Sequence, residues 1–156
     1  MLAGVILLIV LFASAAFLYT VPDSSESAAG VLTEWQEAQS TWAENRPSTV
    51  RYRVERICEC RDDERRPYLV EDRDGRLDAR LPVPIYSSSG EATTVPPRVF
   101  GIDDLFKKIG DAIDEGVEFE VRYDTTFGYP RRLVIGVSPG EQQRFEIVDF
   151  IAVDGY

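Results

Sequence analysis

The most reactive side chains in this chain belong to two cysteines, Cys58 and Cys60, which are separated by a single glutamate. In an oxidising compartment, two cysteines form one disulfide by default. Alternate residues of an extended strand lie about 6.6 Å apart, at the upper limit for the Cα atoms of bridged cysteines, so this bridge requires a local bend. The sequence leaves three interpretations open: a structural disulfide, a redox or mixed-disulfide role, and either free thiols or a site for a soft metal ion.

The residue types that support most catalytic and metal sites are missing. The chain has no histidine, which excludes Ser-His-Asp and Cys-His catalysis and any histidine-ligated metal site. It also lacks the glycine-rich phosphate-binding motifs. The segment Asp72-x-Asp74-Gly75-x-x-Asp78 has the spacing of half a calcium loop, but Val70 and Leu81 stand where that loop needs ligands. We therefore predict no catalytic residue, no metal ligand and no cofactor, and we favour a domain that is not an enzyme.

The loop Tyr123-Asp124-x-x-x-Gly128-Tyr129-Pro130 is the remaining candidate site. The Asp124 side chain can accept a hydrogen bond from the backbone N–H two residues further on, and Gly128 permits a positive φ. Turn geometry alone therefore explains these residue types. The alternative is that the loop binds a partner, with five candidate binding residues: Tyr123, Asp124, Gly128, Tyr129 and Pro130.

The loop lies between two segments whose alternation predicts β-strands. Residues 117–123 alternate apolar with charged side chains, and the alternation resumes at residues 133–137, so the loop closes a β-hairpin. Asp74-Gly75 predicts a second hairpin with a two-residue turn. A last strand is predicted over residues 145–153.

The cysteines lie at the end of another predicted strand, residues 50–60. Tyr52 and Val54 share the parity of both cysteines, so the strand has one apolar face that we expect to pack against the helices. Arg56 and Ile57 interrupt this pattern late in the strand.

Two amphipathic helices are predicted, one over residues 31–45 and one over residues 102–115. Trp35 and Trp42 lie seven residues apart on the first helix, so they share a face, which we expect to point into the core. In the second helix we expect ion pairs between residues four positions apart, Asp103 with Lys107 and Asp104 with Lys108.

The order of these elements predicts an α+β fold. A helix and strands are followed by an aperiodic loop over residues 82–98, and then by a second helix and three more strands. Hairpins with two helices on one face give a two-layer domain with an antiparallel sheet of five or six strands. Because a helix followed by strands occurs twice, the order is compatible with a tandem repeat, although residue identity does not support one.

The N-terminal segment, residues 2–21, is uncharged and almost wholly apolar. At a helical rise of about 1.5 Å per residue, it is long enough to cross the hydrocarbon core of a membrane. Ala13-Ser14-Ala15 also resembles a signal peptide cleavage site, so secretion after cleavage is the alternative. The expected organisation is a transmembrane anchor or signal peptide over residues 1–21, a flexible tether over 22–30 and an extracytoplasmic α+β domain over 31–156.

Three motifs together resemble a known family: Trp35 with Trp42, Cys58-x-Cys60, and the loop Tyr123-Asp124-x-x-x-Gly128-Tyr129-Pro130. Over about residues 31–150, the chain resembles a bacterial family of exported proteins and lipoproteins that is classed only as a domain of unknown function. The resemblance implies an extracytoplasmic domain in the bacterial cell envelope, and it supplies no activity.

These observations define two expectations about function. The first is a non-enzymatic domain, anchored to the membrane through residues 2–21 or exported, that binds a protein, a peptide or an envelope component. Binding would use the loop at residues 82–99 and the turn at residues 124–130. The second is a thiol-disulfide protein that uses Cys58 and Cys60. The net charge of −10 argues against nucleic acid as a partner in either case.

Overall fold

The computed structural model describes residues 24–82, 84–86, 88–96, 98–136, 138, 140 and 142–153. The predicted anchor or signal peptide, residues 1–21, lies outside this part of the chain. None of the helices formed by the described residues is long and apolar enough to span a membrane.

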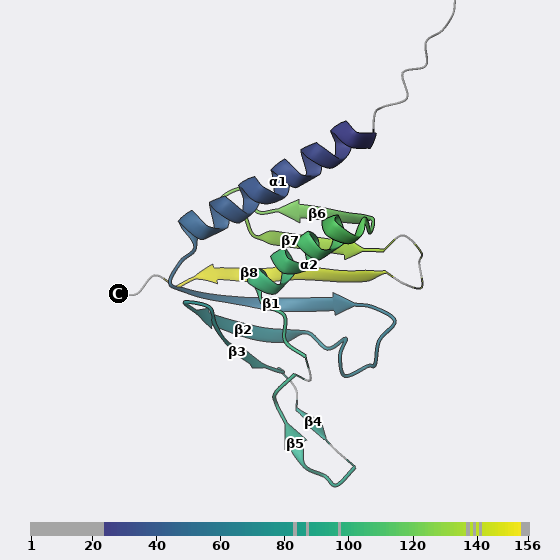
Figure 1. The fold of residues 1–156 in the computed structure, drawn as a ribbon. Coiled ribbons are helices and arrows are strands. Elements are labelled where there is room, and N and C mark those ends of the chain that lie inside the picture. The colour runs from purple at the N-terminus through teal and green to yellow at the C-terminus, as the bar shows by residue number, and fades with distance from the viewer. Residues whose placement is uncertain are drawn as a thin grey trace, which may run out of the picture.

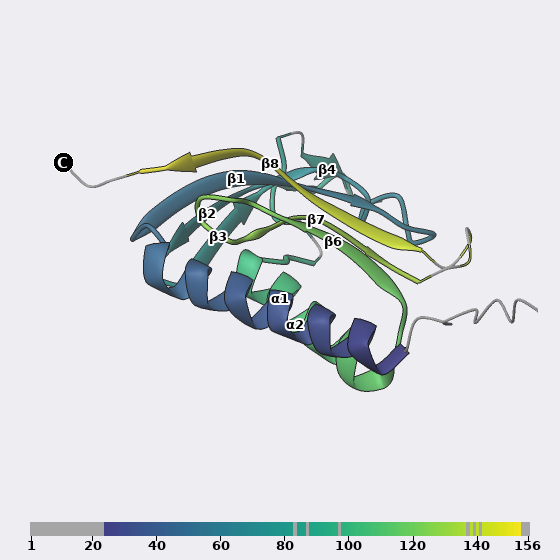
Figure 2. The ribbon, with the colours of Figure 1, turned by 90° about the horizontal axis from the view of Figure 1, so that it is seen from above.

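Two helices cover one face of a six-stranded antiparallel sheet, and no helix formed by the described residues covers the other face (Figures 1 and 2). The strand order is β3-β2-β1-β8-β7-β6, and a separate two-stranded sheet contains β4 and β5. This arrangement confirms the predicted two-layer α+β fold. The elements are α1 (Ser24–Asn45), β1 (Thr49–Ile57), β2 (Tyr68–Arg73), β3 (Arg76–Arg80), β4 (Ile85–Tyr86), β5 (Ala92–Thr93), α2 (Ile102–Glu115), β6 (Phe119–Tyr123), β7 (Pro130–Ile135) and β8 (Gln143–Ala152).

The two halves of the domain have the same element order. In each half a helix precedes three strands that pair with their sequence neighbours, and the pairing of β1 with β8 joins the halves into one sheet. The order within the sheet therefore repeats, since β3-β2-β1 is followed by β8-β7-β6. The small hairpin of β4 and β5 lies between the halves in sequence and projects beyond β3 (Figure 1).

The first helix begins earlier than the sequence pattern predicts. It starts at Ser24 rather than at residue 31, so residues 24–30, which we expected to be a flexible tether, belong to α1. Ala28 and Ala29 fall in this stretch, and alanine has the highest helix propensity of all residues. The apolar periodicity that we used marks only the part of the helix that packs on the sheet.

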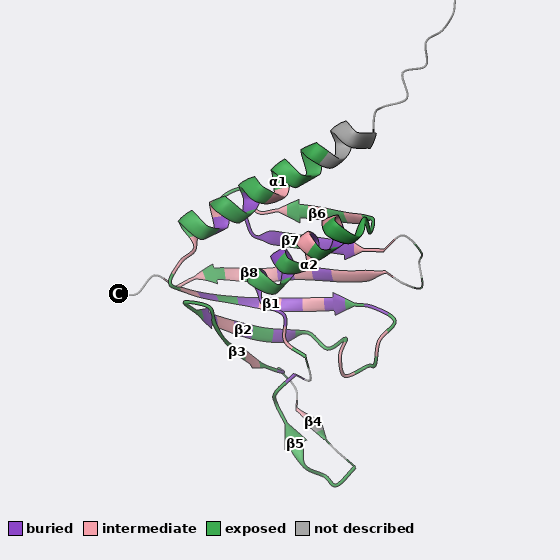
Figure 3. Cartoon of the chain, in the orientation of Figure 1, coloured by how far each residue is buried: buried purple, intermediate pink, exposed green. Residues whose placement is uncertain are grey.

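The core lies between the helices and the inner face of the sheet (Figure 3). Alternate residues of β1 and β2 point into it, as their buried-exposed alternation shows. Trp42 is buried, and Trp35 is half-buried and donates from Nε1 to the carbonyl oxygen of Phe106 at 3.2 Å, so both tryptophans face the core as predicted. The largest fully buried side chains are Tyr52, Tyr68, Phe106, Phe145, Ile102, Leu105, Ile109 and Leu133.

One polar network joins the end of α1 to the β2–β3 hairpin and to the start of α2. The Arg46 guanidinium donates to both carboxylate oxygens of the buried Asp72, at 2.9 and 2.7 Å, and to Asp103 Oδ2 at 2.9 Å. Asp72 Oδ1 also accepts from the backbone N–H of Gly75 at 2.9 Å. The predicted Asp74-Gly75 turn is confirmed, with φ of 49° and 87°, the combination that a type I′ hairpin requires.

The ion pairs that we predicted within α2 do not form, because both aspartates have other partners. Asp103 accepts from the indole of Trp42 and from Arg46. Asp104 Oδ2 accepts from the backbone N–H of Gly101 at 2.8 Å and so caps the helix. Lys107 pairs with Asp111 instead, at 2.8 Å.

Candidate binding surface

The uncovered face of the sheet carries the strand residues that point away from the helices. Charged side chains dominate it, and three large apolar side chains interrupt them: Ile57 on β1, Leu69 on β2 and Ile151 on β8. Their exposed fractions are 54%, 48% and 58%. Such residues stabilise nothing in the isolated domain, since burial in the core is what makes an apolar side chain stabilising.

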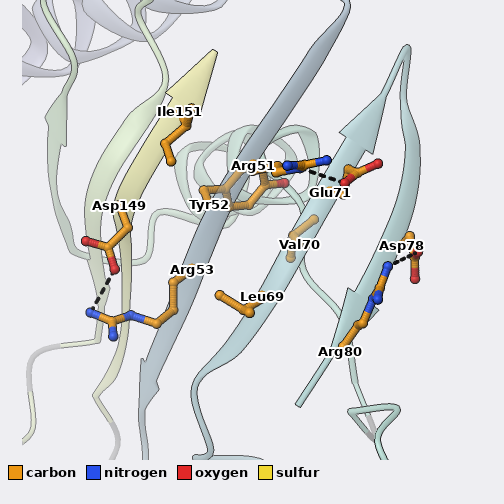
Figure 4. Close-up of a pocket in the computed structure, with 10 residues that line it drawn as sticks. All are labelled: Arg51, Tyr52, Arg53, Leu69, Val70, Glu71, Asp78, Arg80, Asp149 and Ile151. Carbon is orange, nitrogen blue, oxygen red and sulfur yellow. Dashed lines mark hydrogen bonds and ion pairs between the residues drawn. The ribbon is translucent and has the colours of Figure 1, made fainter. Parts of the chain in front are cut away.

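A shallow groove of about 430 Å³ lies on this face, across β8, β1, β2 and β3 (Figure 4). Leu69 and Ile151 are its exposed apolar side chains. Arginines of β1 and β3 stand around them, namely Arg51, Arg53 and Arg80. An apolar centre with a polar rim is the usual anatomy of a protein–protein interface.

Each arginine of the rim pairs with a carboxylate of a neighbouring position (Figure 4). The pairs are Arg51 with Glu71 at 2.7 Å, Arg53 with Asp149 at 3.3 Å, and Arg80 with Asp78 at 3.2 Å. Exposed ion pairs of this kind contribute about 0 to 1 kcal/mol, so a ligand can replace either member at little cost. Hydrogen bonds from Arg51 and Arg73 lower the pKa of Glu71, which keeps this carboxylate ionised.

A β-bulge in β8 shapes one side of the groove. Arg51 pairs with Ile151 and Arg53 pairs with Val148, so β8 contains one residue more than β1 between these positions. Asp149 adopts a φ of 54°, in the left-handed region that aspartate tolerates better than most residues. As a result, Asp149 lies beside Arg53 on the open face, and Phe150 stacks on Tyr129 on the helix side, with ring centroids 4.4 Å apart.

The predicted binding loop between β6 and β7 has an architectural role in this structure. Asp124 Oδ1 accepts from the backbone N–H groups of Thr126 and Phe127, at 2.9 and 2.8 Å, and Gly128 has a φ of 79°, as the turn geometry predicted. Gly128 lies against α1, since a Cβ atom there would be 2.6 Å from the carbonyl oxygen of Ala38. The loop therefore fixes the hairpin to the helix layer.

The five residues proposed for binding do not form an accessible surface. Gly128, Tyr129 and Pro130 are buried, while Tyr123 and Asp124 are half-buried. The Tyr123 ring stacks on Phe106 of α2 at a centroid distance of 6.2 Å. None of the five lines the groove on the open face. Their residue types serve the turn and the core in this structure, and binding by these five residues stays a prediction.

The second predicted binding segment, residues 82–99, is partly a hairpin rather than a plain loop. It contains β4 and β5, and the carbonyl oxygen of Thr94 accepts from the backbone N–H of Leu81 at 2.6 Å. Tyr86 and Val95 are 69% and 62% exposed. This projecting arm therefore stays a candidate for partner contact.

The two cysteines form a disulfide, with Cα atoms 5.2 Å apart. β1 ends at Ile57, and residues 58–60 bend, which is the departure from an extended strand that the bridge requires. Cys58 is buried with 8% exposed, but Cys60 is half-buried. The burial that the prediction for both cysteines requires is therefore found for Cys58 and not for Cys60, and the interpretation as free thiols is wrong.

Sequence reasoning missed the groove, although the printed sequence contains a signal for it. Leu69, which lines the groove, occupies the parity of β2 that otherwise carries charged side chains, and Ile57 does the same on β1 outside the groove. We treated Ile57 only as an interruption of the alternation; a single outward apolar residue is common, and it is the grouping of Leu69 with Ile151 in the folded sheet that indicates a contact surface. Across the described parts of the chain, no group of three or more Cys, Asp or Glu side chains is arranged to hold a metal ion.

A protein-family model matches most of the chain. Residues 34–141 match a family described as "Family of unknown function (DUF6174)", and the match spans more than half of the chain. No curated protein and no solved structure matches. The match supports the predicted resemblance to a domain-of-unknown-function family, whereas bacterial origin and export stay predictions.

Proposed function

The chain belongs to this family of unknown function, and from that premise we propose that its domain binds an extended segment of a partner protein in the cell envelope, without enzymatic activity. The observation that carries the proposal is the groove on the open face of the sheet. The domain would be anchored to the membrane through residues 2–21, or exported after cleavage of that segment.

The composition of the groove supports a peptide segment as the ligand. Leu69 and Ile151 offer apolar contacts that water now covers, and their burial by a partner would be favourable by about 25 cal/mol per Å². The guanidinium groups of Arg51, Arg53 and Arg80 can donate to backbone carbonyl groups or to acidic side chains of the partner. A groove of about 430 Å³ accommodates a few side chains rather than a folded domain.

The disulfide supports a location outside the cytoplasm. Disulfides persist in oxidising compartments and are rare in the cytosol. Cys58 is buried at the end of β1, where the bridge secures the start of the loop that leads to β2. Together with the apolar segment at residues 2–21, this feature favours the cell envelope.

The test introduces a glutamate in the groove and compares its effect on complex formation with that of a glutamate on the helix layer. Leu69→Glu and Ile151→Glu alter the groove, and Leu32→Glu on α1, where leucine is 38% exposed, is the matched control. In native gels of solubilised membranes, the wild-type chain and Leu32→Glu should migrate in the same larger complex. Both groove variants should lose that complex while keeping the wild-type melting temperature. Retention of the complex by both groove variants would refute the proposal.

A thiol-disulfide role is the second candidate, because Cys60 is half-buried and so is the more exposed of the two cysteines. Thiol exchange requires a thiolate to reach a disulfide sulfur. A redox titration of the purified protein, with insulin reduction as the activity assay, separates the two candidates. A reduction potential below about −300 mV without insulin reduction would leave the disulfide structural.

A further inference from the structure

Three cationic side chains gather around two aromatic rings on the helix side of the sheet, the side opposite the open face. Phe100 and Phe145 pack edge to face, with centroids 5.0 Å apart. The Arg56 guanidinium lies 5.3 and 5.6 Å from their two centroids, and Lys108 Nζ lies 5.1 and 5.4 Å from the same centroids. Arg98 lies 4.8 Å from Phe100. We call Arg56, Arg98 and Lys108 the basic cluster.

The negative charge beside the basic cluster does not balance it. Arg56, which is 6% exposed, pairs with Glu64 at 2.9 Å. Within the described residues, neither Arg98 nor Lys108 has an ion-pair partner, and Arg98 is exposed. The adjacent Lys107 is different, because it pairs with Asp111. Among the described residues, Glu64 is therefore the one carboxylate in direct ion-pair contact with the basic cluster, while Asp104 and Asp111 act on Lys108 without forming an ion pair with it.

The charge of Lys108 is destabilised by its surroundings. Its pKa is lowered by burial first, and then by the positive charges of Arg98 and Arg56, while Asp111 and Asp104 oppose this effect. Asp104, the residue four positions before it, is the natural partner on α2, but it caps the helix by accepting from Gly101. The sequence thus contains a partner for Lys108, and the fold uses that partner elsewhere.

We propose that the basic cluster binds an oxyanion of the phosphate or sulfate class. The anion would accept hydrogen bonds from Arg98 and Lys108, whose side chains are long enough to adjust to it, and would face the positive charge of the buried Arg56. Cation–π contacts with Phe100 and Phe145 hold the cations in place before the anion arrives. The whole-protein charge argues against long nucleic acids, but a single anion responds to the local field.

The ligand can be a free anion or a phosphate group on a larger molecule such as a lipid, because the recognised chemistry is the same. The basic cluster shares no residue with the groove on the open face. Oxyanion binding therefore stands or falls independently of the proposed peptide binding, and a variant in one site should leave the other unaffected.

The test is a titration of the purified full-length protein with inorganic phosphate, at constant ionic strength against chloride. We expect phosphate to raise the melting temperature of the wild type, and we expect Lys108→Gln and Arg98→Gln each to weaken phosphate binding at least tenfold. Lys107→Gln is the matched control and should bind phosphate like the wild type. No difference between phosphate and chloride, or an equal loss in all three variants, would overturn the proposal.

A second measurement excludes a purely structural role of Lys108. In chloride alone, Lys108→Gln should melt at the same temperature as the wild type or higher, because the variant removes repulsion from Arg56 and Arg98. A lower melting temperature in chloride would instead mean that the ammonium group is part of the fold, which contradicts the proposal. Flotation with phosphatidylglycerol vesicles, compared with phosphatidylcholine vesicles, then distinguishes the sources: cluster-dependent flotation identifies a headgroup, and its absence a free anion.

Discussion

The two faces of the central sheet are built by alternate residues of the same strands, yet they differ in almost every physical property. On the helix side, aromatic and aliphatic side chains are buried, and Asp72, the one carboxylate that is buried among the described residues, accepts hydrogen bonds at both oxygens. On the open side, apolar residues such as Ile151 are exposed and the ion pairs are in solvent. One parity of these strands therefore supplies the core, and the other parity forms the surface for which we propose recognition.

The charges of the two layers also differ in kind. The exposed surface of the helices is mainly acidic, with Glu34, Glu37, Glu44, Asp111, Asp114 and Glu115. On the open face, acidic residues alternate with arginines, which are Arg51, Arg53, Arg73, Arg76, Arg80, Arg122, Arg132 and Arg144. Away from the basic cluster, the exposed surface of the helices therefore repels a partner with acidic side chains more strongly than the open face does.

The largest difference in stability should appear between two arginines. Arg46→Ala leaves the buried carboxylate of Asp72 without its ion-pair partner, and we expect a loss of about 3 kcal/mol in the free energy of unfolding. Arg51→Ala removes an exposed ion pair and should cost less than about 1 kcal/mol. Urea unfolding of both variants measures the contrast. Equal losses would mean that the two faces contribute alike.

A smaller contrast separates two glycines that both have a positive φ. At Gly128 an alanine Cβ would lie 2.6 Å from the Ala38 carbonyl oxygen, so Gly128→Ala should cost about 2 to 3 kcal/mol through strain and overpacking. At Gly116 nothing lies within 4 Å, and Gly116→Ala should cost only about 1 kcal/mol for its left-handed conformation. If Gly128→Ala melts like Gly116→Ala, the loop does not pack on α1 as described.

The disulfide allows a comparison of its two sulfur positions, one buried and one partly exposed. In the absence of the bridge, Cys58→Ser with Cys60→Ala puts a hydroxyl in the buried position, whereas Cys58→Ala with Cys60→Ser puts it near solvent. We expect the first double variant to be less stable by about 1 to 2 kcal/mol, the cost of a buried hydroxyl without a partner. Thermal unfolding measures the difference, and the reverse order of stability would place Cys60, not Cys58, in the core.

The smallest effect concerns alkaline pH. Burial, with a contribution from Asp124, raises the pKa of Tyr129 to about 12, although Arg131 opposes the shift. A raised folded-state pKa means that this tyrosine contributes stability that is fully present below the unfolded pKa of about 10 and is lost as pH rises towards 12. Tyr129→Phe should therefore flatten the loss of stability between pH 10 and 12. Tyr86→Phe, at a tyrosine that is 69% exposed, should leave the profile unchanged.

Local features of the fold could be predicted from the sequence because a few neighbouring residues determine them. Residues close in sequence determine three of the elements: the Asp74-Gly75 turn, the turn at Asp124 to Gly128 and the helix Ile102–Glu115. The apolar parity of β1 was predicted for the same reason, since alternation is visible in the sequence.

Features that depend on distant partners could not be predicted in this way. The pairing of β1 with β8 joins residues about a hundred positions apart, and neither strand's sequence identifies its partner strand. Arg56 is buried like the other inward residues of β1. Its charge is paired with Glu64, and its guanidinium lies against the rings of Phe100 and Phe145. Asp104 and Lys108 have the spacing of an ion pair, but the backbone of Gly101 takes the carboxylate.

Position-resolved photo-crosslinking in native membranes tests the central claim most directly. A photoreactive amino acid replaces Leu69 or Ile151 on the open face, and Leu32 or Lys107 on the helix layer. The open-face positions should give a discrete crosslinked partner, identified by mass spectrometry, and the helix-layer positions should not. Adducts from Leu32 and Lys107, with none from Leu69 and Ile151, would contradict the assignment of recognition to the open face.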